Sequence, residues 1–464
     1  MSDTFGELRR REFSRLDALG HVYLDYTGSG LYAESQVRAH ADYLCGSVLG
    51  NPHSRNPTSL ASTLKVEEAR HRVLGFFHAD PDAYEVIFTL NASGACKLVA
   101  EAYPWEPGGT FLLTADNHNS VHGVREYAAA HGAQVRYVPL DAELRVDCLE
   151  EHLRGAAPGR HHLFAFPAQS NFSGVKHPLE WIETARAHGF HVLLDAAAFV
   201  PTSRLDLREH TPDFVCLSFY KMFGFPTGVG ALLMRRNALG ELHRPWFSGG
   251  TVRFVSAQNQ LHLPHVNGRA FEDGTLNYLG ITATAAGLDF LAGIGVERIN
   301  AHVMGLTAGL LERLRELRHS DGAPLVRLYG PPGMEQRGGC VAFNLLDPRG
   351  EVVRYWVVEE RAKAELISLR GGFFCNPGAA ECAFGYRDQD TFNCIEPLTP
   401  ETFLLDRFAE CMGDSPVGAV RVSLGIASNQ ADVDRLLAFL ETFRDRPAED
   451  IPVSRATAAL AGVD

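Results

Sequence analysis

Residues 214–234 have the sequence FVCLSFYKMFGFPTGVGALLM, in which one lysine separates two apolar runs. FVCLSF, from Phe214, and VGALLM, from Val229, are almost continuously hydrophobic, a pattern typical of strands buried on both faces. Lys221 follows the first run and precedes a glycine-rich turn, so it can reach a ligand that lies over the edge of a sheet. Position alone favours a surface lysine that begins a loop. Its neighbours must therefore decide whether it has a chemical role.

Similar apolar runs recur upstream and alternate with helical patterns. Helices are expected from Ser93 to Ala102 and from Leu179 to Ala187, because apolar residues recur there at three- and four-residue spacing. This alternation predicts an α/β fold, with a mostly parallel sheet sandwiched by helices. The other expected strands are YEVIFT from Tyr84, TFLLT from Thr110, QVRYVPL from Gln134, HLFAF from His162 and HVLLD from His191.

The chain changes character near residue 293. Long amphipathic helices follow, with Gly/Pro-rich interruptions at Gly330 to Gly333 and Asn376 to Gly378, and a terminal helix after Asn429. The Ala-rich tail after Asp450 is expected to be loosely held. We expect two domains: a large one over 31–292, and a smaller α+β domain built from 1–30 together with 293–464.

Composition excludes several classes of function. The formal net charge of −13 argues against a nucleic-acid partner, which would require an excess of Lys and Arg. The charged opening segment MSDTFGELRRREFSRLD, and the lack of any run of about eighteen apolar residues, predict neither a secretory signal nor a membrane span. The nine cysteines show no CxxC spacing, which favours reduced thiols in the cytoplasm over a disulfide framework or a structural metal site.

Asp195 changes the interpretation of Lys221. It ends the strand HVLLD and precedes Lys221 by 26 residues, room for one helix and one strand, so both side chains can emerge at the same sheet edge. A carboxylate beside a pyridine nitrogen keeps that nitrogen protonated, and the protonated ring stabilises a carbanion. This is what pyridoxal 5′-phosphate (PLP) requires. The alternative role for Asp195 is to cap a helix that begins at AAAF.

Several blocks, in order along residues 20 to 430, resemble the class V aminotransferase family, and within it the amino-terminal half of molybdenum-cofactor sulfurases and the related cysteine desulfurases. The resemblance implies a dimeric PLP-dependent transferase of fold type I with a seven-stranded sheet. The blocks are YLDYTGSG from Tyr23, GNPHSRNPTS from Gly50, SNFSGVKHPLEWI from Ser170, LLDAAAFVPTSRLDL from Leu193, the lysine block, FSGGTVRF from Phe247, FEDGTLNYLG from Phe271 and LRGGFFCNPGA from Leu369.

The resemblance implies roles for residues around the cofactor ring. Lys221 would form the Schiff base and then move the α-proton of the substrate, while Asp195 would hold the ring nitrogen. His118 would stack on the ring, and Asn171 would bond its phenolic oxygen. Taken singly, His118 and Asn171 could equally be solvated turn residues.

The resemblance also implies how the cofactor phosphate and the substrate carboxylate are held. The phosphate would lie at a helix N-terminus and at hydroxyl groups, and Arg421 would grip the substrate carboxylate, although a surface ion pair is its alternative role. Thr275 would complete the phosphate site of the neighbouring subunit in a homodimer. The residues expected at the phosphate of their own chain are Ala92, Ser93, Gly94, Ser218 and Tyr220.

Cys375 bears on the reaction. It lies in GGFFCNPGA, and it matches the cysteine that accepts sulfur as a persulfide in molybdenum-cofactor sulfurases; a buried structural thiol is the alternative. The chain departs from the family at Phe373 and Ala380, where further cysteines are expected, and at Ala198, where simpler desulfurases have glutamine. It also ends at Asp464, without the second half that binds molybdopterin in the eukaryotic enzymes, so we expect a separate sulfur acceptor or a different PLP reaction.

Three hypotheses remain open at this point. The first is a cysteine desulfurase that stores sulfur on Cys375 and releases alanine. The second is a biosynthetic enzyme that acts on a cysteine S-conjugate by β-elimination, oxidative deamination or amino transfer, without using the thiol. The third is a binding protein that has lost catalysis, which the pair of Lys221 and Asp195 disfavours.

Overall fold

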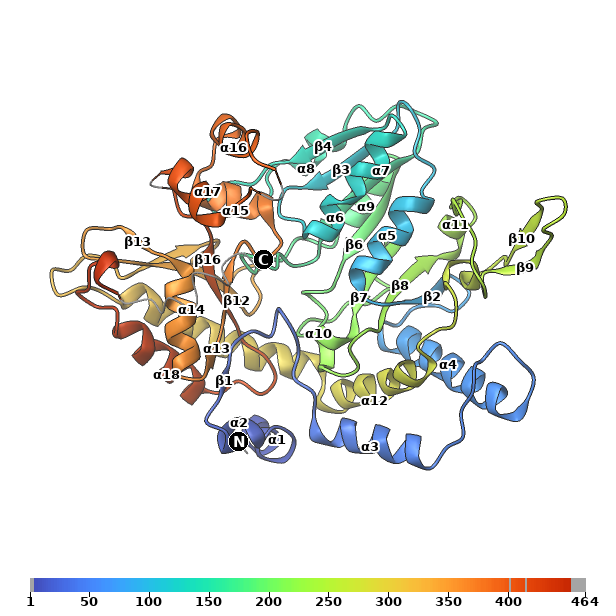
Figure 1. The fold of residues 1–464 in the computed structure, drawn as a ribbon, viewed down its shortest axis with the longest axis horizontal. Helices are drawn as coiled ribbons and strands as arrows, with labels where there is room; N and C mark the ends of the chain where they lie inside the picture. Colours follow the sequence, from blue (N-terminus) through green and yellow to red (C-terminus); the bar gives the residue numbers. More distant parts are fainter. Residues whose placement is uncertain (1–3, 400–401, 414, 452–464) are drawn as a thin grey trace.

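The computed structural model describes residues 4–399, 402–413 and 415–451, so the predicted loose tail, apart from Ile451, lies outside the described residues. Its larger sheet has seven strands in the order β2-β8-β7-β6-β5-β3-β4 (Figure 1). Only β8 runs against its neighbours; every other pairing in this sheet is parallel. The predicted α/β class and mostly parallel sheet are confirmed. The strands are β2 (Tyr84–Thr89), β3 (Thr110–Thr114), β4 (Gln134–Val138), β5 (His162–Pro167), β6 (Phe190–Asp195), β7 (Phe214–Ser218) and β8 (Gly230–Arg235).

Helices cover both faces of this sheet, and successive residues of a strand therefore enter different cores. Phe111 and Leu113 of β3 pack into the cluster beneath α5 and α7, while Leu112 between them packs into the cluster shared with α4 and α9. Both faces are thus apolar, which explains the continuous hydrophobic runs. The helices of this part are α3 (Glu34–Cys45), α4 (Pro57–Phe76), α5 (Ala92–Ala102), α6 (Asn119–His122), α7 (Val124–Ala130), α8 (Leu149–Leu153), α9 (Trp181–Ala187), α10 (Phe219–Phe223), α11 (Arg236–Leu239) and α12 (Tyr278–Ile294), with the 3-10 turn Gly268–Phe271.

A smaller antiparallel sheet lies beside the first, in the order β11-β12-β16-β15, with β13 paired to β12. The start of the chain joins this part, because β1 pairs in parallel with β14. The strands are β1 (Val22–Tyr23), β11 (Val326–Tyr329), β12 (Cys340–Leu346), β13 (Val352–Val353), β14 (Ile367–Ser368), β15 (Arg370–Gly372) and β16 (Ala419–Ser423). The helices are α1 (Thr4–Glu12), α2 (Arg15–Ala18), α13 (Val296–Glu316), α14 (Tyr355–Ala364), α15 (Pro377–Phe384), α16 (Asp388–Ile395), α17 (Leu405–Met412) and α18 (Gln430–Glu441), with the 3-10 turn Ala448–Asp450.

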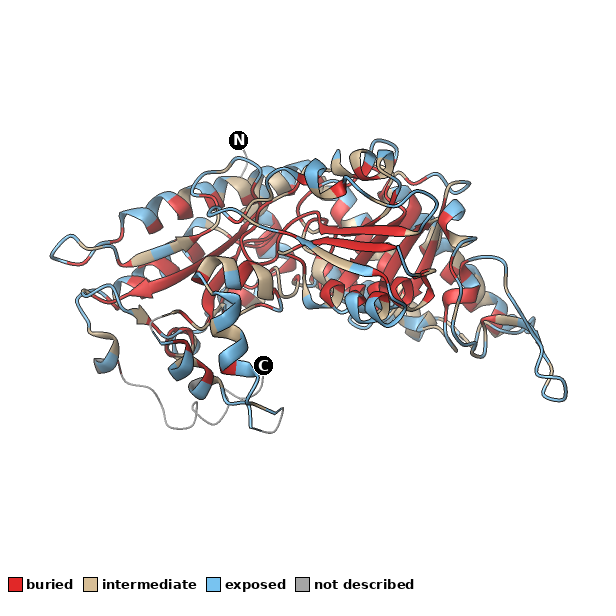
Figure 2. Cartoon of the chain, turned by 90° about the horizontal axis from the view of Figure 1, so that it is seen from above, coloured by how far each residue is buried: buried red, intermediate tan, exposed pale blue. Residues whose placement is uncertain are grey.

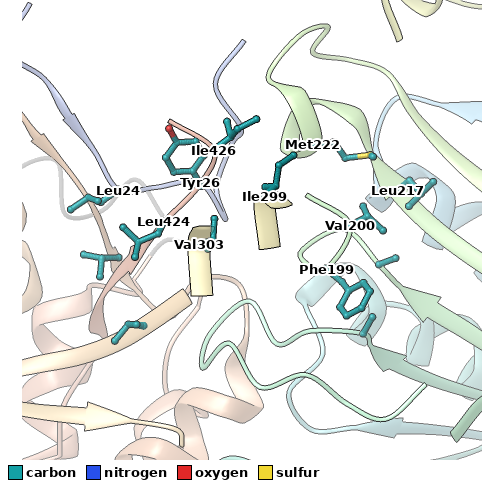
Figure 3. Packing of buried hydrophobic residues seen from close by; sticks show 14 of the residues in the cluster. Leu24, Tyr26, Phe199, Val200, Leu217, Met222, Ile299, Val303, Leu424 and Ile426 are labelled. Carbon is teal, nitrogen blue, oxygen red and sulfur yellow. The ribbon is translucent and has the colours of Figure 1, made fainter. Parts of the chain in front are cut away.

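One apolar core continues between the two sheets. Figure 3 shows Ile299 and Val303 of α13 between Leu24 and Leu424 on one side and Leu217 of the larger sheet on the other, and all five belong to one buried cluster. The two sheets are therefore joined through α13 by one continuous apolar core. The predicted division at residues 31 and 293 stays a prediction.

Two expectations about the second half of the chain are wrong. Asn376 to Gly378 begins α15 rather than interrupting the structure, because Asn376 caps the helix by accepting from the Ala379 amide and Pro377 occupies its first position. Cys394 and Cys411 form a disulfide between α16 and α17, so not all the thiols are reduced, and cysteine usage no longer argues for a reducing compartment.

The hairpin of β9 (Val252–Val255) and β10 (His262–Pro264) extends from one end of the molecule, and most of its residues are exposed (Figure 2). Within the described ranges, no single helix is long and apolar enough to cross a membrane. The bent pair α12 and α13, which meet at 69°, satisfies length and composition only when the two are taken together.

Candidate active site

The carboxyl ends of the parallel strands place most of the predicted residues at one edge of the larger sheet. His118 follows β3, Asn171 follows β5, Asp195 ends β6, and Lys221 lies in α10 directly after β7. The smaller sheet supplies the others, since Arg421 lies in β16 and Cys375 in the loop after β15. Asp195, Arg421 and Cys375 all lie close enough to Lys221 to influence the pKa of its amine, so the structure brings residues of the larger and the smaller sheet together.

Lys221 is held close to the amino-terminal segment of the chain. The Gly30 amide donates to the Tyr220 carbonyl at 3.0 Å, and a Cβ on Gly30 would lie 2.8 Å from the Lys221 carbonyl oxygen, so only glycine allows this approach. Burial lowers the pKa of the Lys221 amine, an effect opposed by Asp195 and reinforced by Arg421. The amine is thereby biased towards its neutral, nucleophilic form.

Asp195 and His118 flank the lysine. Asp195 is buried, and its Oδ1 accepts from the Ala197 amide at 3.0 Å in a turn; no helix begins there, so it is not a helix N-cap. His118 does cap a helix, because its Nδ1 accepts from the Ser120 amide at 3.1 Å, which leaves the ring proton of the neutral form on Nε2. Burial first, and then the Lys221 charge, lowers the pKa of His118 to about 4. At neutral pH the ring is therefore uncharged.

The N-terminus of α5 forms a hydroxyl-rich end to this site. The Ala92 amide already donates to Ser218 Oγ at 2.9 Å, and the Gly94 amide donates to the N-cap Asn91 at 2.9 Å. Ser93 is exposed, and its hydroxyl lies 2.5 Å from the hydroxyl of Ser120. The predicted backbone donors Ala92 and Gly94 are thus engaged by protein acceptors, while the Ser93 and Ser120 hydroxyls lie near the positive end of the helix.

Tyr220 belongs to the same cluster of hydroxyls, because its phenol lies close enough to the Ser218 side chain for that side chain to influence its pKa. Burial raises the pKa of Tyr220, so its phenol stays protonated and can donate a hydrogen bond.

The Cys375 loop lies over the site from the side of the smaller sheet. The Cys375 side chain is exposed, and its backbone carbonyl accepts from the Asn119 amide at 2.7 Å, next to His118. Asn171 donates from Nδ2 to the Phe374 carbonyl at 2.7 Å, so its amide contacts this loop as well as the edge of the sheet. The alternative of a buried structural thiol does not hold for Cys375.

Arg421 lies in a charged cluster that the sequence did not reveal. Its guanidinium donates to Asp25 Oδ1 and to the Asn171 carbonyl, both at 3.0 Å, and stacks over the Phe374 ring. Its Nε is buried without a hydrogen-bond partner among the described residues. Arg370 grips the same Asp25 through Nε and Nη2, at 2.7 Å for the closest pair. Asp25 therefore orients two arginines, and the Nε of Arg421 keeps an unused hydrogen-bond donor.

Thr275 shares a cavity with Gly94, one of the residues predicted at the phosphate. It is exposed, its hydroxyl accepts from Asn51 at 3.0 Å, and it lines a cavity of about 330 Å³ beside Gly94 and Lys97.

A lysine amine with a lowered pKa, a buried carboxylate, a neutral imidazole and a hydroxyl-rich helix N-terminus together suit an aromatic aldehyde that carries a phosphate. The family model described as aminotransferase class-V matches residues 22–436. The chain belongs to the class-V aminotransferase family. It is an enzyme of this PLP-dependent family, and the donors described above fit that cofactor.

Curated relatives of the chain carry a more specific name. It is 37% identical to the molybdenum cofactor sulfurase of Bos taurus over 99% of this chain and 54% of that protein. It is 37% identical to the Homo sapiens protein of the same name over 97% and 53%, and 35% identical to that of Arabidopsis thaliana over 94% and 57%. The chain spans about half the length of these relatives.

Solved structures support the fold. The apo cysteine desulfurase from Thermococcus onnurineus NA1 superposes with a TM-score of 0.77 at 24% identity, covering 94% of this chain and 97% of that one. The cystine C-S lyase C-DES, in complex with its reaction product cysteine persulfide, gives a TM-score of 0.70 at 19% identity, covering 93% and 100%. At these identities the likeness establishes the architecture alone.

Proposed function

We propose that this chain is a PLP-dependent cysteine desulfurase of the molybdenum-cofactor-sulfurase kind, which takes the sulfur of cysteine onto Cys375 as a persulfide. The observation that carries the proposal is the position of Cys375, an exposed thiol on a loop bonded to Asn119 and Asn171 over the same sheet edge as Lys221. Amino transfer or β-elimination would need Lys221 and Asp195 but gives no role to this thiol.

The site residues divide the work of binding. Asp195 would hold the pyridine nitrogen, the neutral His118 ring would lie against the cofactor, and Ser93 would hold the phosphate with the other hydroxyls at the end of α5. Bound through Lys221, PLP supplies an electron sink next to the α-carbon of the amino acid. Arg421 would bind the substrate carboxylate through its unused Nε, with Asp25 fixing the plane of the guanidinium.

The chain's own residues then move protons and sulfur. Lys221, whose amine is biased towards the neutral form, takes the α-proton; two protons then return to the substrate, one to the β-carbon and one to the α-carbon, and they replace the α-proton and the thiol proton that Cys375 gives up. Cys375 gives up its thiol proton and attacks the substrate sulfur, so that a sulfur–sulfur bond forms and the carbon–sulfur bond breaks. The β-carbon is reduced to a methyl group as the sulfur is oxidised, so cysteine and a thiol become alanine and a persulfide without an external oxidant.

Two partners belong to this proposal. The names of the curated relatives favour a molybdenum cofactor as the final sulfur acceptor, reached from the exposed Cys375. A homodimer would bring Thr275 and the exposed β9–β10 hairpin against a second chain.

The proposal is tested by incubating the PLP-loaded protein with L-cysteine and measuring alanine, pyruvate and the mass of the Cys375 peptide. Alanine and a gain of one sulfur atom on Cys375 are expected. Cys375→Ala should abolish both, whereas Cys382→Ala, which removes a half-buried thiol of α15, should change neither. A Cys375→Ala enzyme that still makes alanine at the wild-type rate, or a wild-type enzyme that makes pyruvate instead, would contradict the proposal.

A further inference from the structure

The loop that carries Cys375 is held in an unusual backbone conformation. Phe374 and Cys375 are consecutive residues with left-handed backbones, at φ 56° and φ 52°. Residues other than glycine pay a steric cost there, and such a conformation persists only when the surrounding structure imposes it. The position of the Cys375 thiol therefore depends on the groups that hold these two peptides.

Asn171 and Asn119 make the direct contacts. The Asn171 side chain donates to the Phe374 carbonyl at 2.7 Å, and the Asn119 amide donates to the Cys375 carbonyl at 2.7 Å. A side-chain amide can present either its oxygen or its nitrogen to a neighbour, so something must orient Asn171 for this donation.

Asn376 supplies that orientation. It is completely buried, and its Nδ2 donates to Asn171 Oδ1 at 2.9 Å and to the Asp116 carbonyl at 2.7 Å. A donor facing Asn171 Oδ1 turns the Asn171 Nδ2 towards Phe374. The Asn376 oxygen meanwhile accepts from the Ala379 amide at 3.2 Å and caps α15.

Capping α15 does not explain this asparagine. Aspartate or serine would cap the helix about as well, since the cap uses only an acceptor oxygen. At this buried position Asn376 uses both N–H donors of its side chain and its acceptor oxygen. Of the common capping residues, only asparagine has two donors and an acceptor in one side chain.

We propose that Asn376 is a positioning residue for the Cys375 thiol, acting through the side-chain amide of Asn171. The inference rests on the proposed function, because it assigns Asn376 to the sulfur-accepting half of that reaction. Asn171 is also the residue expected at the cofactor's phenolic oxygen, so one amide would link the bound ring to the thiol loop.

Asn376→Asp tests this role, because it keeps the acceptor for Ala379 and removes both donors. Asn429→Asp is the matched control: Asn429 caps α18 in the same way, and its Nδ2 makes no hydrogen bond among the described residues. Three quantities are measured: the rate of sulfur loading on Cys375, the exchange of the α-proton of L-alanine in D₂O, which needs Lys221 but no thiol, and backbone hydrogen exchange in residues 370–380.

For Asn376→Asp near neutral pH, sulfur loading should fall on the order of 10- to 100-fold, the cost of misplacing a reacting group by about an ångström. The α-proton exchange should stay within about threefold of wild type. Hydrogen exchange over 370–380 should become faster in the protein with or without PLP, and Asn429→Asp should behave as wild type in all three.

The pH profile separates positioning from a general structural effect. As the pH falls, the introduced carboxyl takes up a proton and regains one donor, so loading should recover relative to wild type. Asn376→Ala, which has no donor at any pH, should show no recovery.

Loading and hydrogen exchange equal to wild type in Asn376→Asp would overturn the inference. So would an equal loss of loading and of α-proton exchange. If the wild-type protein forms no persulfide at all, the proposed function fails, and the hydrogen exchange of 370–380 alone decides whether Asn376 holds the loop.

Discussion

Replacing Asp25 by asparagine tests how the substrate end of the site is held. The Asp25 side chain is 12% exposed; Arg421 is 3% exposed and Arg370 49%. Removing one partner of a buried pair costs about 3–5 kcal/mol, because the remaining charge stays buried. The half-exposed Arg370 adds less than about 1 kcal/mol. Asparagine keeps a neutral acceptor for Arg421, so we expect the free energy of unfolding to fall by about 3 kcal/mol.

The assay is urea unfolding of the cofactor-free protein, followed by fluorescence and circular dichroism. Asp434→Asn is the control, since it removes an exposed partner of Arg313 and should leave the unfolding curve unchanged within error. Arg370→Gln should lose far less stability than Asp25→Asn. A loss below about 1 kcal/mol for Asp25→Asn would refute the reasoning, because it would mean that Arg421 does not depend on this carboxylate.

Three further predictions concern other parts of the site and its supports. Burial and the charge of Lys221 lower the pKa of His118 from 6.5 to about 4, so between these pH values the unfolded chain binds a proton that the folded chain does not. The free energy of unfolding should therefore fall as the pH is lowered from about 6.5 towards 4, by up to about 1.4 kcal/mol per pH unit. The same slope in His118→Phe would contradict this. Cys394→Ser removes the disulfide to Cys411, 17 residues away, and should destabilise α16 and α17 by about 3 kcal/mol. Hydrogen exchange should become faster in these two helices but not in α5, and exchange equal to that of the wild type would count against the prediction. A Cβ on Gly378 would lie 2.2 Å from a backbone carbonyl oxygen, so Gly378→Ala should cost about 1–3 kcal/mol and slow sulfur loading, whereas Gly333→Ala, with open space around it, should do neither.

The larger sheet could be predicted because each of its strands is a local signal. A strand buried on both faces needs a continuous apolar run, and TFLLT or HVLLD shows this without reference to distant residues. The prediction that Lys221 and Asp195 belong to the site rests on the same signal, since each lies at the end of such a run. Parallel strands then bring them to one edge.

Residues held by long-range pairing could not be identified this way. Asp25 meets Arg370 and Arg421 across 345 and 396 residues, because its backbone pairs with Ser423 of β16 in the smaller sheet. No spacing rule connects them. The disulfide between Cys394 and Cys411 was missed because it depends on how α16 packs against α17, and not on a motif.

Asn376 shows a different limit. Its neighbours, a proline and a glycine, suggested an interruption, yet Asn-Pro also begins helices when the asparagine caps the first turn. Its two donor contacts, to residues 205 and 260 positions earlier, appear only in the folded chain.

The central claim is that sulfur passes from cysteine to the thiol of Cys375. A single turnover of PLP-loaded protein with sulfur-labelled cysteine, quenched and digested, tests it most directly. The account predicts one label on the Cys375 peptide, removable by a reductant, for each alanine formed. Label released as free sulfide together with pyruvate, and an unlabelled Cys375 peptide, would contradict it.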